Sequence, residues 1–259
     1  MVDLTRLLTG PLYKLYSWRL WKQVKNGRKP GHVGVILDGN RRFAREKGLN
    51  VWVGHHMGAE KVREFLSWCW EVGIKIVTLY AFSIENFKRR RREIEEIMRL
   101  AKSKFEEVLT DKNIHKYKVK VQAIGRKNML PKELQEIVSE IEQKTKDYSE
   151  HFLNVAIGYG GRAEIVDAFR SIADRVSQGT IKPEEVNESL IEKYLYTAGL
   201  PDPDLIIRTS GEERLSGFLL WQSAYSELYF CEMYWPALRK IDFWRAIRTY
   251  QQRVRRFGS

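Results

Sequence analysis

Short apolar runs rich in β-branched residues alternate along the chain with longer segments whose apolar residues recur every three or four positions. The short runs have the length and composition of buried strands. They cover residues 33–37, 74–82, 119–124, 153–157, 205–209 and 227–230. The longer segments predict amphipathic helices at residues 62–69, 94–108, 134–141, 165–176 and 243–254. This alternation predicts an α/β fold: a single domain with a central, mostly parallel six-stranded sheet flanked by helices.

A carboxylate, a glycine and two arginines follow the first predicted strand, in the stretch HVGVILDGNRRFA at residues 32–44. In parallel sheets, ligands bind beyond the carboxyl ends of the strands. Gly39 allows a tight turn, and Asn40 is suited to cap a short helix. The free N–H groups of that helix and the Arg42 guanidinium would bind an anion. Asp38 would repel the anion unless a divalent cation such as Mg²⁺ lay between them; alternatively, Asp38 only caps the helix.

Two further polar clusters follow predicted strands. The first, after the second strand, consists of Ser83, Glu85, Asn86 and Arg89. Taken alone, it fits equally well with the cap of the helix that follows.

The other cluster follows the fifth predicted strand and consists of Arg208, Arg214 and Ser216. Two arginines and a hydroxyl at this spacing predict a second phosphate site, because each charged hydrogen bond contributes about 1.5–3 kcal/mol. Glu227 lies among aromatic and apolar residues, so its carboxylate needs a metal ion or an arginine as partner.

Two anion sites and one metal site around an apolar sheet predict substrates that carry diphosphates and apolar tails. The Walker A pattern of nucleotide-hydrolysing proteins is absent from the sequence. The aspartate-rich clusters of the all-helical prenyl synthases are absent as well.

The composition narrows the set of partners and the compartment. The 259 residues contain 45 Lys and Arg against 33 Asp and Glu, a net charge of +12 that favours anionic partners. A basic surface that is only solvated is the alternative. The two cysteines, Cys69 and Cys231, fit neither a disulfide framework nor a metal site, and a reducing cytoplasm is the expected compartment. Cys69 lies on an apolar helical stripe, so we expect it in the core.

The first 30 residues mix aromatic and cationic side chains without a continuous apolar run. They show neither a secretory signal nor a stretch long enough to span a membrane. Aromatic residues combined with Lys and Arg are typical of a helix at a membrane surface. We therefore predict an amphipathic extension at residues 1–30, in peripheral contact with the inner face of the membrane, and a catalytic domain at residues 31–259. Packing of the extension on its own domain or on a partner is the alternative.

Several motifs, in the same order, resemble the cis-prenyltransferases, the undecaprenyl diphosphate synthase family. They are HVGVILDGNRRFA, GHHMGAEKV, LYAFSIENFKR, NVAIGYGGRAEIVDA, DLIIRTSGEERLSGFLLWQSAYSELYF and the terminal RRFGS. The resemblance runs from about His32 to the end of the chain. It implies a transferase that adds isopentenyl diphosphate successively to an allylic diphosphate, farnesyl or geranylgeranyl diphosphate. The product would be a long-chain Z-polyprenyl diphosphate, the precursor of the glycosyl carrier lipid.

The resemblance also assigns roles to residues at matching positions. It implies that Asp38 is the essential acid and binds Mg²⁺ together with Glu227, and that Asn86 assists proton removal. The residues implied to bind the substrates are Gly39, Asn40, Arg41, Arg42, Phe43, His55, Ser83, Ile84, Glu85, Phe87, Arg89, Arg208, Arg214, Leu215 and Ser216. Of these, residues 39–43 and His55 would meet the allylic diphosphate, and residues 208–216 the isopentenyl diphosphate.

The growing chain would enter an apolar tunnel between the sheet and the helices expected at residues 60–72 and 94–109, with Ala81 at its mouth. The terminal RFG motif, at residues 256–258, would reach the active site of the other subunit in a homodimer.

Some positions depart from the family's usual pattern. Val51 stands where an arginine often helps to bind the allylic diphosphate, so one phosphate contact is missing or replaced. Phe43 and Phe87 stand where tryptophan is common, and Ser210 where glycine is frequent. The DGNRRFA variant and the N-terminal extension look like archaeal members, for which geranylgeranyl diphosphate is the expected primer.

Two alternatives stay open at the level of the sequence. A non-catalytic partner subunit of a heteromeric cis-prenyltransferase would lose active-site residues. This chain retains Asp38, Asn86, Arg208, Arg214 and Glu227. A nucleic-acid-binding protein would account for the positive charge, but the basic residues are spread along the chain and no known binding module is present, so we expect no nucleic acid partner.

Overall fold

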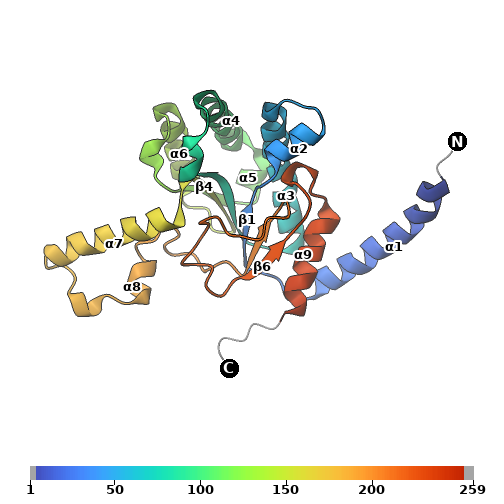
Figure 1. Cartoon of the computed structure of the whole chain (residues 1–259). Helices are drawn as coiled ribbons and strands as arrows, with labels where there is room; N and C mark the ends of the chain where they lie inside the picture. Colours follow the sequence, from blue (N-terminus) through green and yellow to red (C-terminus); the bar gives the residue numbers. More distant parts are fainter. Residues whose placement is uncertain (1–3, 254–259) are drawn as a thin grey trace.

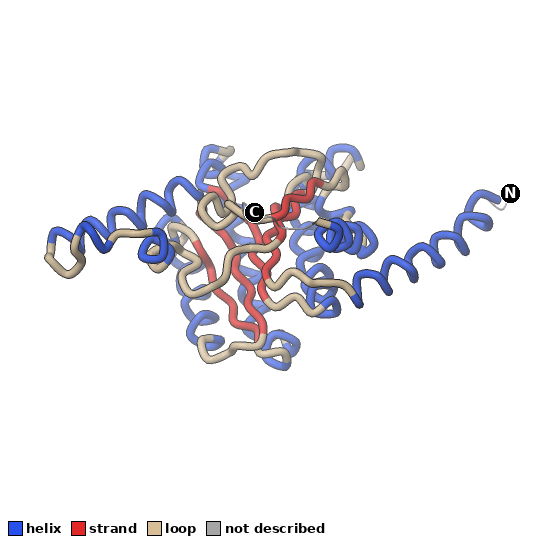
Figure 2. Tube along the Cα trace, turned by 90° about the horizontal axis from the view of Figure 1, so that it is seen from below, coloured by secondary structure: helices blue, strands red, loops and turns tan. Residues whose placement is uncertain are grey.

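Six strands form one sheet in which every neighbouring pair is parallel (Figures 1 and 2). The structure is a computed structural model, and it describes residues 4–253. The strands are β1 (His32–Ile36), β2 (Ile76–Ser83), β3 (Val119–Ile124), β4 (His151–Tyr159), β5 (Leu205–Arg208) and β6 (Glu227–Phe230). They lie in the order β3-β4-β2-β1-β5-β6. The predicted α/β fold is confirmed, and within the described residues the sheet is wholly rather than mostly parallel.

Helices connect the strands, as the helical spacing of apolar residues predicts. In the described part of the chain the α-helices are α1 (Leu4–Asn26), α2 (Asn40–Glu46), α3 (Val51–Val72), α4 (Arg91–Thr110), α5 (Lys112–Lys116), α6 (Lys132–Thr145), α7 (Gly161–Ser177), α8 (Glu188–Glu192) and α9 (Lys240–Gln252). Short 3₁₀ turns are η1 (Ile84–Lys88), η2 (Lys127–Met129), η3 (Pro183–Glu185) and η4 (Trp235–Ala237). Over residues 4–253, no helix combines the length and the apolar character that crossing a bilayer requires.

Alternate residues of each strand face opposite sides of the sheet and therefore enter two different cores. Val33 and Val35 of β1 lie in the larger core, which also contains side chains from α3, α4, α6 and α9. Ile36 lies in the smaller core, beside Tyr80 and Phe218. Helices α3 and α4 therefore cover the same face of the sheet.

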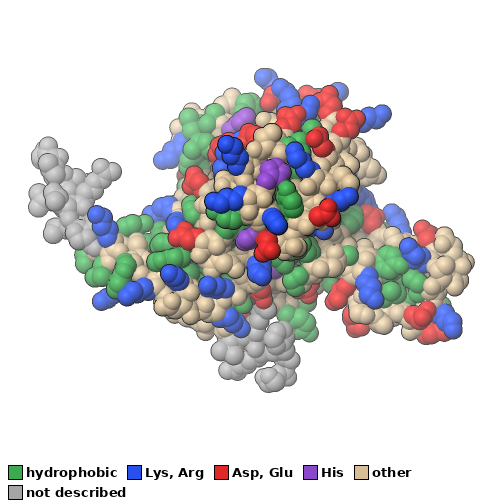
Figure 3. Space-filling view, turned by 180° about the vertical axis from the view of Figure 1, so that it is seen from behind, with side chains coloured by type: hydrophobic (Ala, Val, Ile, Leu, Met, Phe, Trp, Pro, Cys, Tyr) green, Lys and Arg blue, Asp and Glu red, His purple; other side chains and the backbone are tan. Residues whose placement is uncertain are grey.

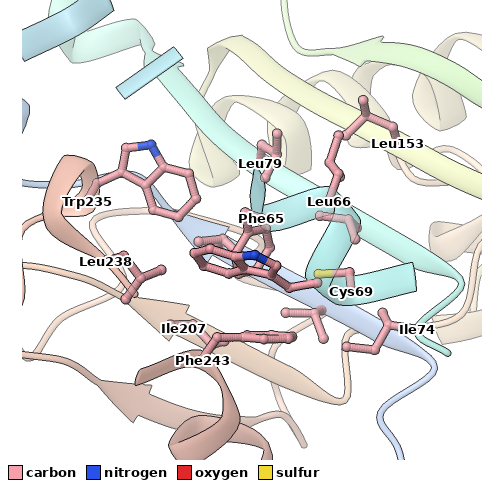
Figure 4. Packing of buried hydrophobic residues seen from close by; sticks show 14 of the residues in the cluster. Phe65, Leu66, Cys69, Ile74, Leu79, Leu153, Ile207, Trp235, Leu238 and Phe243 are labelled. Atoms are coloured by element: carbon pink, nitrogen blue, oxygen red, sulfur yellow. The ribbon is translucent and has the colours of Figure 1, made fainter. Parts of the chain in front are cut away.

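Aromatic side chains fill the centre of the larger core (Figure 4). The ring of Phe65 in α3 lies 5.0 Å from that of Phe243 in α9 and 5.4 Å from that of Trp235 in η4. Cys69, one turn after Phe65, is fully buried in the same core, as its place on an apolar stripe predicts. This packing holds α3 against the sheet beside β1.

The helix predicted at residues 165–176 is present as α7, but its buried face differs from the stripe on which the prediction depended. Glu164, Ala168 and Ile172 are buried, whereas Phe169 is 70% exposed. The buried Glu164 explains the shift, because it accepts hydrogen bonds from the Tyr159 hydroxyl, at 2.5 Å, and from Gln222, at 3.0 Å. A hydrogen-bonded carboxylate thus takes a core position that hydrophobicity alone would give to Phe169.

Helix α1 extends away from the body of the molecule and packs against α9 only near its carboxyl end (Figure 1). Leu20 and Val24 are almost completely buried in the larger core, and the ring of Trp21 stacks on that of Trp244 at 5.1 Å. The exposed part of the helix carries apolar side chains such as Leu12 and Trp18 together with the cation Arg19, so the amphipathic extension stays a prediction. The carboxyl end of α1 thus packs on the body of the molecule, and the domain boundary predicted near residue 30 stays a prediction.

Candidate active site

A polar cavity of about 500 Å³ lies at the carboxyl ends of β1, β2 and β5, which are neighbours in the sheet. Their adjacency brings together clusters that are far apart in the sequence. The predicted site residues that line it are Asp38, Gly39, Asn40, Arg41, Arg42, His55, Ser83, Asn86, Arg89, Arg208 and Ser216. Most of the predicted site therefore forms one cavity.

Asp38 links the first and the third cluster. One of its oxygens, Oδ2, accepts a hydrogen bond of 2.7 Å from Nη2 of Arg208, a side chain that is only 4% exposed. The other, Oδ1, accepts the Gly39 N–H at 2.7 Å and lies 3.4 Å from Nη2 of Arg42. Burial raises the pKa of Asp38, but the hydrogen bond and positive charge of Arg208 outweigh this effect, so the pKa is lowered and the group is an anion at neutral pH.

Arg42 is held by acceptors from the loop after β5. It donates to Oε1 of Glu212 at 2.8 Å and to Oγ of Ser210 at 2.6 Å. Ser210 adopts a left-handed backbone with φ 80°, which explains why glycine suits this position. The guanidinium predicted to bind a diphosphate is thus paired with carboxylates in this structure.

A second group of cations surrounds Glu93, which the sequence analysis did not single out. Its Oε1 accepts a hydrogen bond of 3.1 Å from Arg89 and lies 3.7 Å from both Nη1 of Arg41 and Nε2 of His55. At 3.7 Å the latter two are too distant for hydrogen bonds. The buried carboxylate of Glu93 thus brings together three side chains that could bind an anion.

Several buried donors at the site have no hydrogen-bond partner among the described residues. They are Nε of Arg41, Nε of Arg208 and Nε2 of His55. Burial, together with the charge of Arg89, lowers the pKa of His55 to about 4, so the imidazole is neutral at pH 7. Buried polar groups normally have partners, so these atoms indicate a place for an anionic ligand.

The second cluster adopts the cap that was its alternative interpretation. Oγ of Ser83 accepts the Asn86 N–H at 3.3 Å, and Oδ1 of Asn86 accepts the Ser83 N–H at 3.2 Å. Both side chains still line the polar cavity. The cap therefore positions Asn86 at the cavity instead of competing with a role there.

Four predicted substrate-binding residues of α2 and η1 do not line the cavity: Phe43, Ile84, Glu85 and Phe87. Glu85 is exposed, and the Phe87 ring packs edge-on against Phe82 at 4.9 Å. Phe87 therefore supports the wall formed by β2.

In the loop after β5, Arg208 donates to Oγ of Ser216 at 2.8 Å and also to the carbonyl oxygen of Arg214. The Arg214 side chain is mostly exposed and paired with Glu212, and Leu215 packs on the smaller core. Only Arg208 and Ser216 of this loop line the polar cavity.

Asn40 does not cap α2 as predicted but is its first residue. The N-cap is Gly39, whose φ of 99° requires the left-handed backbone that only glycine adopts easily. Helix α3 approaches closely: a Cβ added to Gly54 would lie 2.2 Å from the Asn40 carbonyl oxygen, and one added to Gly58 2.4 Å from Asn40 Oδ1. These two glycines therefore allow α3 to hold Asn40 at the cavity.

Within one chain Glu227 does not lie near Asp38, so the metal site predicted from these two carboxylates stays a prediction. It is the first residue of β6 and pairs through Leu205 with Val33, at the amino end of the sheet. Asp38 follows Val33 by five residues, about 16 Å along a strand. Glu227 is instead paired with Arg253 at 2.7 Å. Because Glu227 opens a parallel strand, it lies at the edge of the sheet opposite to the polar cavity.

An apolar cavity of about 560 Å³ adjoins the polar one. It lies between α3, α4 and the face of the sheet that carries the larger core. The two cavities share Leu37, Asn40, His55, Ala81 and Ile97. Ala81 thus lies at the junction of the two cavities. A cavity where charged groups open directly into an apolar space suits a ligand with an anionic head and an apolar tail.

Comparison with known proteins agrees with this geometry. A profile of the family described as "Putative undecaprenyl diphosphate synthase" matches residues 36–258. The chain belongs to the undecaprenyl diphosphate synthase family. The family predicted from the motifs is therefore confirmed.

Two curated relatives match the chain from end to end. The tritrans,polycis-undecaprenyl-diphosphate synthase (geranylgeranyl-diphosphate specific) of Methanocaldococcus jannaschii is 51% identical over 262 residues, which cover 100% of this chain and 94% of that protein. The isoprenyl transferase of Thermus thermophilus is 50% identical and covers 100% of both chains. The similarity thus includes the N-terminal segment that the motifs left out.

Solved structures of the family share the fold. The lavandulyl diphosphate synthase from Lavandula x intermedia, crystallised in complex with dimethylallyl diphosphate, superposes with a TM-score of 0.84 at 35% identity, over 89% of this chain and 99% of that one. A probable undecaprenyl diphosphate synthase from Campylobacter jejuni gives a TM-score of 0.72 at 34% identity, over 90% and 100% of the two chains.

Three charged residues of the site were not predicted from the sequence: Arg45, Glu93 and Glu212. Arg45 lines the polar cavity one turn after Arg42. Glu93 and Glu212 pair with its arginines. Helical spacing could have found Arg45, and Glu93 lies four residues after Arg89. No signal in the sequence alone connects Glu212 with Arg42, which is 170 residues away.

Among residues 4–253, no three His, Cys, Asp or Glu side chains gather as a potential metal site. Proteins commonly bind Mg²⁺ through one or two carboxylates, while substrate phosphates and water complete the shell. The half-buried, ionised Asp38 at the wall of the polar cavity provides one such carboxylate.

Proposed function

We propose that the chain condenses isopentenyl diphosphate onto an allylic diphosphate and builds a Z-polyprenyl diphosphate. The observation that carries this proposal is the junction of the two cavities. Arginines and His55, three of whose buried nitrogen atoms lack partners, surround one cavity, and apolar side chains line most of the other. An allylic diphosphate bound across the junction would keep its head among the arginines while its tail enters the apolar cavity.

We infer that the allylic diphosphate displaces acids from Arg41, Arg42 and His55. Arg45 would supply the charge that family members often take from an arginine at the position of Val51. Val51 opens α3 and does not line the polar cavity, whereas Arg45 does. Each charged hydrogen bond formed would contribute about 1.5–3 kcal/mol.

Asp38 is the residue that would hold Mg²⁺ beside the diphosphate. When bound, the ion would neutralise charge that develops on the leaving diphosphate. Glu227 could take part only if a second chain brought it to the site. Arg208 and Ser216 would bind isopentenyl diphosphate, and Arg214 would need to turn inward from Glu212.

The reaction itself needs few protein groups. As the allylic C–O bond breaks, the arginines stabilise the charge on the departing diphosphate, and the C4 alkene of isopentenyl diphosphate attacks the allylic carbon. A C2 proton then leaves. Asn86 is too weakly basic to take that proton, so we infer that it relays the proton to a phosphate oxygen.

The relatives support geranylgeranyl diphosphate as the primer, because the archaeal enzymes carry that specificity in their names. The decisive experiment incubates the purified chain with Mg²⁺, labelled isopentenyl diphosphate and either farnesyl or geranylgeranyl diphosphate. We expect long-chain products, with the higher kcat/KM for geranylgeranyl diphosphate. Absence of products with both primers would refute the proposal and favour a non-catalytic partner subunit.

We also propose that α1 contacts an anionic membrane surface. Leu12, Tyr13, Leu15 and Trp18 are 46–68% exposed, Lys22 lies 4.1 Å from the Trp18 ring centroid, and residues 4–26 contain no acid. Aromatic and cationic side chains together suit the interface of a bilayer. Flotation with anionic but not neutral vesicles would support this contact, and Trp18→Ser should weaken it.

The predicted homodimer stays a proposal, and exposed apolar residues of α7 support it. Phe169 is 70% exposed and Val166 43%. Sedimentation of wild type and Phe169→Ser tests whether α7 lies in the subunit contact. Residues 256–258, predicted to reach the partner's site, lie outside the described residues.

A nucleic acid partner gains no support, since acidic and basic side chains are interspersed on the face seen in Figure 3.

A further inference from the structure

Ion pairs connect α3 to α4 along the apolar cavity. Lys104 of α4 is paired with Glu60 of α3 and, at 2.7 Å, with Glu107. Arg63 of α3 lies 3.4 Å from Glu107 and 3.5 Å from Asp111. We call these five residues, Glu60, Arg63, Lys104, Glu107 and Asp111, the seam.

The two helices run alongside each other from the polar cavity toward the opposite edge of the sheet. His55 faces Glu93 at the polar cavity, Glu60 faces Lys104 further along, and Arg63 faces Glu107 and Asp111 beyond that. Residue numbers in these contacts increase together in α3 and α4, so the two helices run in the same direction. The seam therefore follows the length of the cavity instead of closing one end of it.

All five seam residues also line the apolar cavity. Their side chains are 18–61% exposed to solvent. Long side chains of this kind cover apolar space with their stems while their charged ends stay in water. The seam is thus the wall between the cavity and solvent on this side.

The seam is a weaker wall than the others. The opposite wall is the sheet, where Leu79, Val121 and Leu153 are almost completely buried. Solvent-exposed ion pairs contribute only about 0.2–1 kcal/mol each. Separating α3 from α4 at the seam therefore costs far less than moving a strand.

We propose that the seam is the gate that limits the length of the polyprenyl chain. While it is closed, the chain stops when it fills the cavity. When it opens, the far end of the chain passes sideways between α3 and α4, and elongation continues. This inference depends on the proposed function, since it concerns where the product of that reaction goes.

The test reverses one charge of the seam. Lys104→Glu places three carboxylates beside one another at residues 60, 104 and 107, so their repulsion opens the seam. We expect its most abundant product to be longer than that of wild type by at least one prenyl unit. The charge-swapped double variant Glu60→Lys/Lys104→Glu restores attraction and should return the product length toward that of wild type.

Lys102→Glu is the matched control. It reverses a charge in the same helix, but Lys102 pairs with Glu133 of α6 and does not line the cavity. We expect wild-type products from it. A folded, active Lys104→Glu enzyme whose products match those of wild type and Lys102→Glu would overturn the proposal, as would a double variant that stays as altered as the single one.

A second measurement separates this inference from the proposed function. If the wild-type chain forms no product, the proposed function fails, and hydrogen exchange then decides about the seam. A long-chain polyprenyl alcohol, but not farnesol, should increase exchange in α3 and α4 around residues 60–63 and 104–107. Equal exchange with both alcohols would refute the gate.

Discussion

Asp38 belongs to two ion-pair systems at once, because Arg208 and Arg42 both contact it. Because its pKa is lowered, Asp38 is an anion at neutral pH and can bind a divalent cation such as Mg²⁺. At the scale of single residues, Asp38 acts through its negative charge and contributes little to packing.

Asp38→Asn should therefore reduce kcat by at least about 100-fold, the scale of loss when one electrostatic contact to a transition state is removed. Because the amide oxygen still accepts from Arg208, we expect unfolding free energy to fall by less than about 2 kcal/mol. Steady-state kinetics with Mg²⁺ and urea unfolding measure the two effects. A near-normal kcat would exclude Asp38 from the reaction.

His32 gives a pH dependence that belongs to the fold and not to the site. It is 1% exposed, with Nε2 at 2.8 Å from Thr78 Oγ1 and Nδ1 at 2.7 Å from the Pro201 carbonyl oxygen. Burial lowers its pKa to about 4 in the folded protein, against 6.5 in the unfolded chain. Between these values the unfolded state binds more protons, so stability is complete above pH 6.5 and falls as the pH decreases.

We expect this group to contribute a loss of about 2 kcal/mol in unfolding free energy between pH 7 and pH 5. His32→Gln cannot titrate, so its stability deficit relative to wild type should shrink by that amount over the same range. Urea unfolding of both proteins at the two pH values measures the difference. A deficit that is the same at both pH values would contradict the buried neutral imidazole.

At the scale of elements, the junction of the cavities is determined by the end of β2. Ala81 lies there with its neighbours Leu37 of the β1 loop and Ile97 of α4. Ala81→Leu would fill part of the passage from the polar to the apolar cavity. We expect shorter products with little change in the first condensation step.

Product sizing by chromatography checks this prediction, with Ala198→Leu in the exposed turn before β5 as the matched substitution. An unchanged product distribution in Ala81→Leu would show that the chain does not pass this residue.

The elements themselves could be predicted well, because each strand is a compact apolar run and the polar clusters follow strands that are neighbours in the sheet. The structural details that could not be predicted depend on long-range contacts. The position of Glu227 depends on the direction of β6, and the buried face of α7 depends on a hydrogen-bond network to residue 222. No local pattern in the sequence reports either contact.

At the scale of the whole molecule, α1 has two different apolar sides. Leu20 is 2% exposed and lies in the core with α9, whereas Leu15, in the same helix, is 46% exposed. Leu20→Ala should therefore lower the unfolding free energy by about 2–5 kcal/mol. Leu15→Ala should change it by less than about 0.5 kcal/mol.

Chemical denaturation of the two variants provides a matched comparison of one residue type in one helix. If both variants lost about 2–5 kcal/mol of unfolding free energy, α1 would pack along its whole length. If neither lost more than about 0.5 kcal/mol, α1 would not belong to the folded body.

The parallel course of α3 and α4 beside the apolar cavity has a consequence for engineering. Ile97, Ala101 and Phe105 line that cavity at steps of four residues, so each is about 6 Å deeper than the one before. Each of these positions therefore lies at a different depth along the growing product. Replacing them one at a time with bulkier side chains should give a series of enzymes, each of which ends elongation at a different chain length.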